Sequence, residues 1–178
     1  MTDEVLLVDR LKANDAQAWA QIYDRHYQQI YNYLYYQLRG ASEAEDLAAE
    51  VFLRALEAIS SYTPRGLPLV SWLYRIGHNL VVDHLRQQSR RGQLPLQESL
   101  VGDHESSEGL LQSKIEKEEL LRALQHLTVD QRQVLILKFV QEMDSSGVAQ
   151  VLGKTEGAVK SIQHRALASL KRVLERTQ

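Results

Sequence analysis

Apolar residues recur at three- and four-residue spacing along most of this chain, a period typical of amphipathic helices. In the first half the pattern predicts three helices, over about 15–39, 43–59 and 70–90. The segment 60–68 contains two prolines and a glycine, so we expect a loop there. The first helix is predicted to bury one stripe, made of Ala18, Trp19, Ile22, Tyr23, Tyr27, Ile30, Leu34 and Leu38.

Residues with known capping preferences lie near the ends of these helices. Asp15 is the predicted N-cap of the first helix, and Gly40 is predicted to supply its left-handed end. Ser42 and Glu45 have the spacing of a capping box that opens the second helix. In the second half, Thr128 is predicted to start a further helix.

The apolar period fails between residues 92 and 113, where proline, glycines, serines and acids interrupt it. Helical spacing resumes over 114–127, from 128 onward, and over 144–152 and 155–176. The pattern therefore predicts an all-α fold of two small helical domains, residues 1–91 and 114–178, joined by a flexible acidic linker over 92–113.

The last two predicted helices meet the steric demands of a helix-turn-helix. Ala149 is small where the helices touch, Gly153 lies at the turn, where a positive φ is needed, and Val159 faces the core. The second helix then presents an outer surface suited to base edges in the major groove, formed by Thr155, Glu156, Lys160, Ser161, Gln163, His164 and Arg165. The alternative is that the two helices form an ordinary helical hairpin that does not bind DNA.

The charge is unevenly distributed, which favours a polyanionic partner for the end of the chain. The formal net charge of the 178 residues is -2, but segment 120–178 has nine Lys/Arg against five Asp/Glu. Segment 91–119 has three against seven. There is no cysteine, which excludes disulfides and thiolate metal sites. We expect a cytoplasmic protein without a targeting segment or membrane insertion.

The sequence offers no catalytic or metal-binding motif. The six histidines, at positions 26, 78, 84, 104, 126 and 164, have no metal-ligand spacing. A glycine-rich phosphate loop and a nucleophile elbow are also missing. We therefore expect neither enzymatic activity nor a cofactor.

Three stretches carry a resemblance to a known family. Residues 131–170, QRQVLILKFVQEMDSSGVAQVLGKTEGAVKSIQHRALASL, resemble the fourth conserved region of bacterial sigma factors of the extracytoplasmic-function group. AEDLAAEVFLRAL (44–56) and SWLYRIGHNLVVDHLR (71–86) resemble the second region of the same family. The motifs occur in the family's order and together span most of the chain.

The resemblance assigns the second helix to binding of core RNA polymerase. In the family, the corresponding helix binds the clamp helices of the polymerase largest subunit, which implies contacts by Asp46, Glu50 and Phe52. Judged from the residues alone, the acids form a solvated helix face and Phe52 belongs to the core.

The resemblance assigns the third helix and the loop before it to the minus-ten promoter element, where a flipped base is held. The helix residues implied are Arg75, His78, Asn79, Arg86 and Arg90, and the loop candidates are Tyr62, Thr63, Arg65 and Gly66. His78 stands where many relatives have arginine, so its backbone contact is expected to be weaker or dependent on pH.

Together these features predict an alternative sigma factor. Its expected partners are core RNA polymerase (the clamp helices and the flap), promoter DNA and an anti-sigma factor. In this interpretation the minus-thirty-five element is read by Thr155, Glu156, Lys160, Ser161, His164 and Arg165. Two alternatives stay open: a stand-alone helix-turn-helix regulator with an N-terminal dimerisation or ligand module, and a helical adaptor that does not bind DNA.

Overall fold

The computed structural model describes residues 3–64, 66–91 and 108–176, with the side chains of 108–116 excepted. All regular structure in these ranges is helical, which confirms the predicted fold class. The helices are α1 (Asp3–Lys12), α2 (Ala16–Leu38), α3 (Ala41–Ala58), the 3₁₀ turn η1 (Ile59–Ser61), α4 (Leu69–Arg90), α5 (Glu108–Gln125), α6 (Val129–Leu135), the π-helical segment η3 (Ile136–Val140), α7 (Ser145–Leu152) and α8 (Glu156–Arg176).

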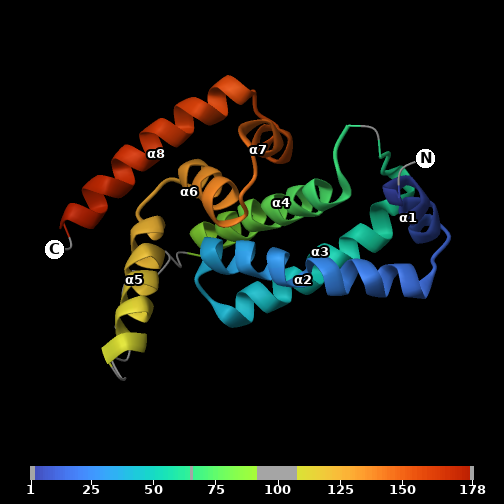
Figure 1. Ribbon diagram of the computed structural model, residues 1–178, viewed down its shortest axis with the longest axis horizontal. Helices are drawn as coiled ribbons and strands as arrows, with labels where there is room; N and C mark the ends of the chain where they lie inside the picture. Colours follow the sequence, from blue (N-terminus) through green and yellow to red (C-terminus); the bar gives the residue numbers. More distant parts are fainter. Residues whose placement is uncertain (1–2, 65, 92–107, 177–178) are drawn as a thin grey trace.

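Helices α2, α3 and α4 pack against one another, and α1 closes one end of this first bundle (Figure 1). Its core is filled by side chains with 5% exposure or less, among them Ile22, Ile30, Leu34, Val51 and Leu73. Burial of one aliphatic face per helix is the main stabilising contribution, because each such side chain contributes about 1.5–3 kcal/mol.

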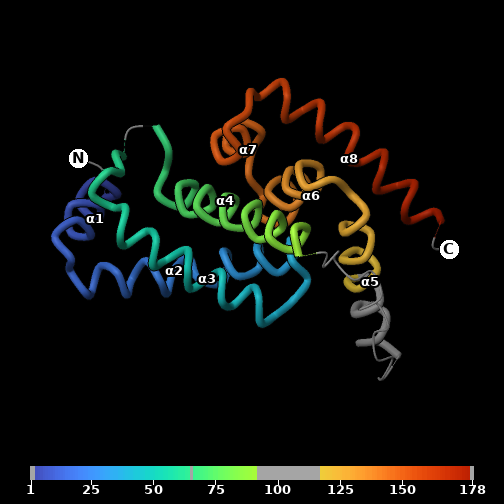
Figure 2. Tube along the Cα trace, turned by 180° about the vertical axis from the view of Figure 1, so that it is seen from behind, coloured from blue at the N-terminus to red at the C-terminus, as the bar shows by residue number. Residues whose placement is uncertain are grey.

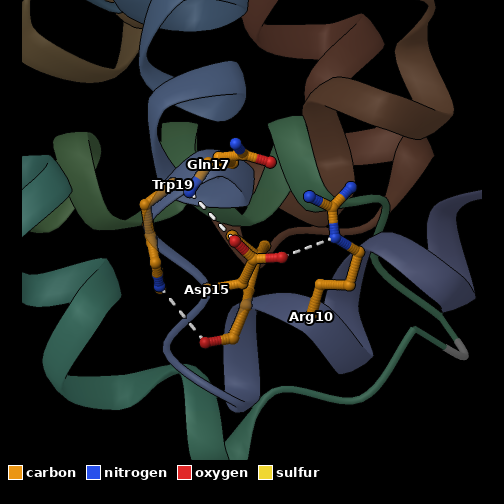
Figure 3. A network of polar contacts seen from close by, with 5 residues as sticks. Arg10, Asp15, Gln17 and Trp19 are labelled. Carbon is orange, nitrogen blue, oxygen red and sulfur yellow. Dashed lines mark hydrogen bonds and ion pairs between the residues drawn. The ribbon is translucent and has the colours of Figure 1, made fainter.

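Helix α1 was not predicted from the sequence, in which the first predicted helix corresponds to α2. It buries Val8 and Leu11, and the Trp19 indole donates a 3.2 Å hydrogen bond to the carbonyl oxygen of Leu11. Asp15 is the N-cap of α2, as predicted: its carboxylate accepts from the Gln17 backbone N–H at 3.0 Å and from the Arg10 guanidinium at 2.8 Å (Figure 3). These hydrogen bonds hold α1 against the start of α2.

The predicted boundary between α2 and α3 was wrong in detail. Arg39 adopts the left-handed conformation (φ 60°) that was expected of Gly40, which has φ -129° and precedes α3 as its N-cap. Because α3 begins at Ala41, the capping box predicted for Ser42 and Glu45 does not form. The stripe of residues predicted to be buried on α2 was also too wide, since Tyr23, which was included in it, is 45% exposed.

Helices α5 to α8 form the second bundle, in which α8 packs against α5, α6 and α7. Thr128 starts α6, as predicted, with a capping box to Gln131. Helix α5 begins at Glu108, inside the range predicted as linker, and residues 92–107 of that linker lie outside the described residues.

The two bundles lie against each other. Helix α4 packs on α7, and α2 packs on α5 and η3. In both Figures 1 and 2, α6 and α7 lie between α4 and α8, so α8 runs along the outer side of the molecule.

Candidate nucleic-acid interfaces

The helix-turn-helix is built from local constraints in α7 and α8. Gly153 ends α7 in the left-handed conformation (φ 67°), as predicted, and its N–H donates to the Ala149 carbonyl oxygen. The Thr155 hydroxyl accepts the Ala158 backbone N–H at 3.0 Å, which caps the start of α8. Val159 is fully buried and fixes the second helix against the first.

All six residues predicted to read the minus-thirty-five element are exposed on α8 or just before it: Thr155, Glu156, Lys160, Ser161, His164 and Arg165. Lys160 pairs with Glu156 at 3.7 Å, but both side chains are more than half exposed, so this ion pair contributes little. Arg165 and His164 line a hollow of about 390 Å³ together with Lys171 and Arg172. The outer face of α8 therefore offers several cations to a polyanion.

The predicted minus-ten residues of α4 fall into two groups. Asn79, Arg86 and Arg90 are exposed along the outer side of the helix. Arg75 and His78 instead face the second bundle: the Arg75 guanidinium donates to the Gln150 carbonyl oxygen, and His78 Nδ1 bonds to Gln133 Oε1. Two of the five predicted α4 residues are thus occupied by contacts within the chain.

His78 is held in an environment that favours its neutral form. Burial is the largest influence and lowers the pKa of His78, with Lys154 and Arg75 acting in the same direction. The hydrogen bond to Gln133 and the charge of Asp130 raise this pKa and only partly offset the burial. Because Gln133 Oε1 is an acceptor, the Nδ1 atom carries the proton.

The loop before α4 is organised around Tyr62, which is only 4% exposed. Its hydroxyl donates to the Leu67 carbonyl oxygen at 2.6 Å, and its ring lies 4.8 Å from that of Trp72. Burial raises the Tyr62 pKa, so the phenol stays protonated. Thr63 and Gly66 are exposed, whereas Arg65 lies outside the described residues.

The acidic face predicted to bind polymerase lies on α3. Asp46 is exposed, and Glu50 accepts from Arg54 at 3.1 Å with both side chains partly in solvent. The Phe52 ring is 9% exposed and packs 5.1 Å from Tyr23 and 6.4 Å from Tyr27. Phe52 thus belongs mainly to an aromatic cluster in which Tyr27 is partly exposed and Tyr23 is exposed.

Sequence reasoning missed a buried polar cluster between the bundles. The Tyr33 hydroxyl donates to Gln133 Oε1 at 3.1 Å, and Arg132 Nε donates to Gln37 Oε1 at 3.1 Å. None of the four side chains is more than 5% exposed, and burial lowers the pKa of Arg132. Tyr33 and Gln37 continue the apolar spacing of Ile30, which was the available signal for their burial.

The described residues contain no group of three or more His, Asp or Glu side chains placed to hold a metal ion. Within the same ranges, no helix is long and apolar enough to cross a membrane.

Comparisons with known proteins match both bundles to one family. Residues 22–91 match the family model "Sigma-70 region 2", and residues 117–170 match "Sigma-70, region 4". The chain is 36% identical over 170 residues to the ECF RNA polymerase sigma factor BldN of Streptomyces coelicolor, with 94% of this chain and 64% of BldN covered. This chain therefore spans less than two thirds of that relative's length.

Two further similarities agree. The ECF RNA polymerase sigma factor SigM of Mycobacterium tuberculosis is 30% identical over 163 residues, with 91% of this chain and 80% of SigM covered. The solved structure of the sigma factor RpoE in complex with the anti-sigma factor NepR from Bartonella quintana has a TM-score of 0.67 at 21% identity, covering 88% of this chain and 96% of that one. The last similarity supports the fold.

Proposed function

Because this chain belongs to the ECF group of RNA polymerase sigma factors, we propose that it binds core RNA polymerase and directs promoter-specific transcription initiation. The observation that carries the proposal is that one chain presents two separate cationic surfaces, on α4 and α8. A stand-alone helix-turn-helix regulator, with an N-terminal dimerisation or ligand module, gives no role to a second cationic surface on α4. The proposal includes a cytoplasmic location and no catalytic activity of the chain itself.

The proposed upstream contact is made by α8 in the major groove at the minus-thirty-five element. Lys160 and Arg165 supply cations on the exposed face, and Ser161 offers a hydroxyl to a base edge. Lys171 and Arg172 extend the same surface along the helix toward the phosphates.

The proposed downstream contact is made by α4 and its preceding loop at the minus-ten element. Asn79 supplies an amide, and Arg86 and Arg90 supply cations for the backbone of an opened strand. Thr63 and Gly66 are exposed at the loop where a flipped base is to be captured. Arg75 and His78 complete this face only after they leave Gln150 and Gln133, so promoter binding requires α4 to separate from α6 and α7.

The proposed polymerase surface combines the acids of α3 with exposed apolar groups nearby. Asp46 and Glu50 provide charge for the clamp helices, while Leu53 (49% exposed) and Leu56 (43% exposed) on the same helix provide apolar area. Exposed leucines at one site are consistent with a protein partner.

We assign the polymerase flap to the second bundle. An apolar hollow of about 170 Å³ lies there between α5, α6, η3 and α8, and Phe139 at its edge is 56% exposed. An anti-sigma factor is a further proposed partner, because the similar RpoE structure contains one.

The test is reconstitution with core polymerase of the source organism. Promoters are first identified by mapping transcription starts after overexpression, and the purified chain is then expected to comigrate with core polymerase and to initiate at those starts. The double variant Asp46→Lys/Glu50→Lys is expected to lose comigration. The control Asp9→Lys/Glu175→Lys makes the same charge change at exposed positions on α1 and α8.

Two outcomes contradict the proposal. A chain that binds a specific duplex alone as a dimer and ignores core polymerase is a regulator. Comigration of the α3 double variant at the wild-type level removes α3 from the polymerase interface.

A further inference from the structure

The start of α4 lacks a cap of its own. Its N-cap residue is Pro68, which has no side chain able to accept a hydrogen bond, although the first backbone N–H groups of a helix need acceptors. The acceptor comes from elsewhere in the chain: Leu69 N–H donates to Glu4 Oε1 at 2.6 Å. Leu69 is 5% exposed in the folded chain, where this carboxylate rather than water satisfies its N–H.

The same carboxylate oxygen reaches the other end of the loop before α4. The Tyr62 hydroxyl donates to Glu4 Oε1 at 3.3 Å as well as to the Leu67 carbonyl oxygen at 2.6 Å, so its single proton is shared between the two acceptors. Tyr62 begins the loop and Leu69 ends it, so one group from α1 joins both ends. The exposed loop residues Thr63 and Gly66 lie between these two fixed points.

Glu4 is itself held in place by the packing of α1. Val8 and Leu11 anchor the helix in the core, and the corner with α2 is closed by the Arg10–Asp15 ion pair and the Trp19 hydrogen bond (Figure 3). Each contact restricts the rotation of α1 relative to α2. These contacts hold the helix that carries Glu4, and the carboxylate itself is bonded to Leu69 and Tyr62.

We propose that Glu4 is a positioning residue for the minus-ten element: through Leu69 and Tyr62 it sets the geometry of the loop and first turn of α4 that receive the opened strand. This inference rests on the proposed function. It adds α1 to the elements that recognise the minus-ten element, and it makes Tyr62 a support for the DNA-facing residues of the loop.

The experiment uses holoenzyme formed from the full chain and core polymerase. A randomised pool of single-stranded DNA is selected on wild-type holoenzyme, and the affinities of the best strand and of its single-base variants are then measured by fluorescence anisotropy. The variants are Glu4→Ala, which removes the acceptor, and Glu4→Gln, whose amide oxygen still accepts from Leu69. The control is Asp9→Ala, an exposed carboxylate on the same helix.

We expect Glu4→Ala to reduce base discrimination by about fivefold, the effect of losing one helix cap, while Glu4→Gln and Asp9→Ala retain it. Affinities for core polymerase and for upstream duplex DNA are expected to stay at wild-type values in every variant. Because discrimination is a ratio measured on assembled holoenzyme, partial unfolding of Glu4→Ala lowers the active fraction and leaves the ratio unchanged.

Wild-type discrimination in Glu4→Ala overturns the inference. So does a Glu4→Gln variant as impaired as Glu4→Ala, because the hydrogen bond to Leu69 is then not the cause. A wild-type holoenzyme that selects no strand from the pool contradicts the proposed function itself, and the inference falls with it.

Discussion

At the scale of single residues, Gly153 is the position where backbone conformation decides the geometry of the helix-turn-helix. Its φ of 67° is costly for a residue with a side chain, and an added Cβ has no atom within 4 Å, so strain alone opposes substitution. We expect Gly153→Ala to lower the free energy of unfolding by about 1–2 kcal/mol, measured by urea denaturation followed by far-ultraviolet circular dichroism.

The control for this prediction is Gly157→Ala, inside α8. The space around Gly157 is equally open, but its backbone is helical, so alanine is expected to stabilise by up to about 1 kcal/mol. Equal effects of the two substitutions contradict the argument from φ.

Residues whose roles depend on local geometry were predictable from the sequence, and those that depend on distant partners were not. Gly153 and Val159 follow from fixed offsets within two helices. The left-handed end of α2 was assigned to Gly40, yet Arg39 occupies it, and its guanidinium pairs at 3.3 Å with Glu118 of α5. Glu118 lies 79 residues from Arg39 in the sequence, so the pattern of residues around Arg39 does not indicate this ion pair.

At the scale of elements, the exposed face of α8 carries the most direct prediction. The Lys160–Glu156 ion pair is worth about 0.3–0.5 kcal/mol, so it does not withhold the lysine from DNA. We expect Lys160→Ala and Arg165→Ala each to reduce transcription from a cognate promoter by about tenfold at limiting holoenzyme, since one contact with a base edge is worth about 1–3 kcal/mol.

Two controls separate this effect from general damage. Both variants are expected to bind core polymerase normally and to match wild type on a promoter whose minus-thirty-five element is scrambled. Lys12→Ala removes an exposed cation from α1 and is expected to change nothing. Full activity of both α8 variants on the cognate promoter removes them from the DNA interface.

Most helices were predictable because their apolar faces repeat over several turns. Helix α1 was missed since it is ten residues long and its buried pair, Val8 and Leu11, spans a single turn. Its stability depends on contacts with α2 that the local pattern does not encode. For the same reason its carboxylate Glu4 was absent from the predicted site, although it supports the loop that the sequence did indicate.

At the scale of the whole molecule, the contact between the bundles is polar and incompletely satisfied. The Nε2 atoms of Gln37 and Gln133 are buried without a hydrogen-bond partner in the described part of the chain, and Arg132 is buried against an amide rather than a carboxylate. Each unsatisfied buried group costs about 1–3 kcal/mol. The interface is thus weaker than an apolar one of the same shape, which agrees with the proposed separation of the bundles on promoter binding.

The response of this contact to pH follows from His78. Burial, together with the charges of Lys154 and Arg75, lowers the pKa of His78 from the ordinary value of 6.5, and the hydrogen bond to Gln133 and the charge of Asp130 offset this only in part. The closed arrangement therefore binds fewer protons than the open one. Stability of the closed arrangement is complete above pH 6.5 and declines as pH falls from there through the lowered pKa. Acidification is therefore expected to open the molecule.

The opening can be measured by energy transfer between fluorophores attached to the two bundles. Glu45→Cys on α3 and Ser161→Cys on α8 supply exposed thiols for labelling, and the chain has no other cysteine that would react. Energy transfer between them is expected to fall as the pH decreases below about 6.5, where a histidine of ordinary pKa in the open arrangement becomes mostly protonated. His78→Gln in the same labelled chain keeps a hydrogen-bonding side chain but cannot titrate, so its energy transfer is expected to stay constant over that range. An unchanged pH response in His78→Gln assigns the transition to another group and removes His78 as its cause.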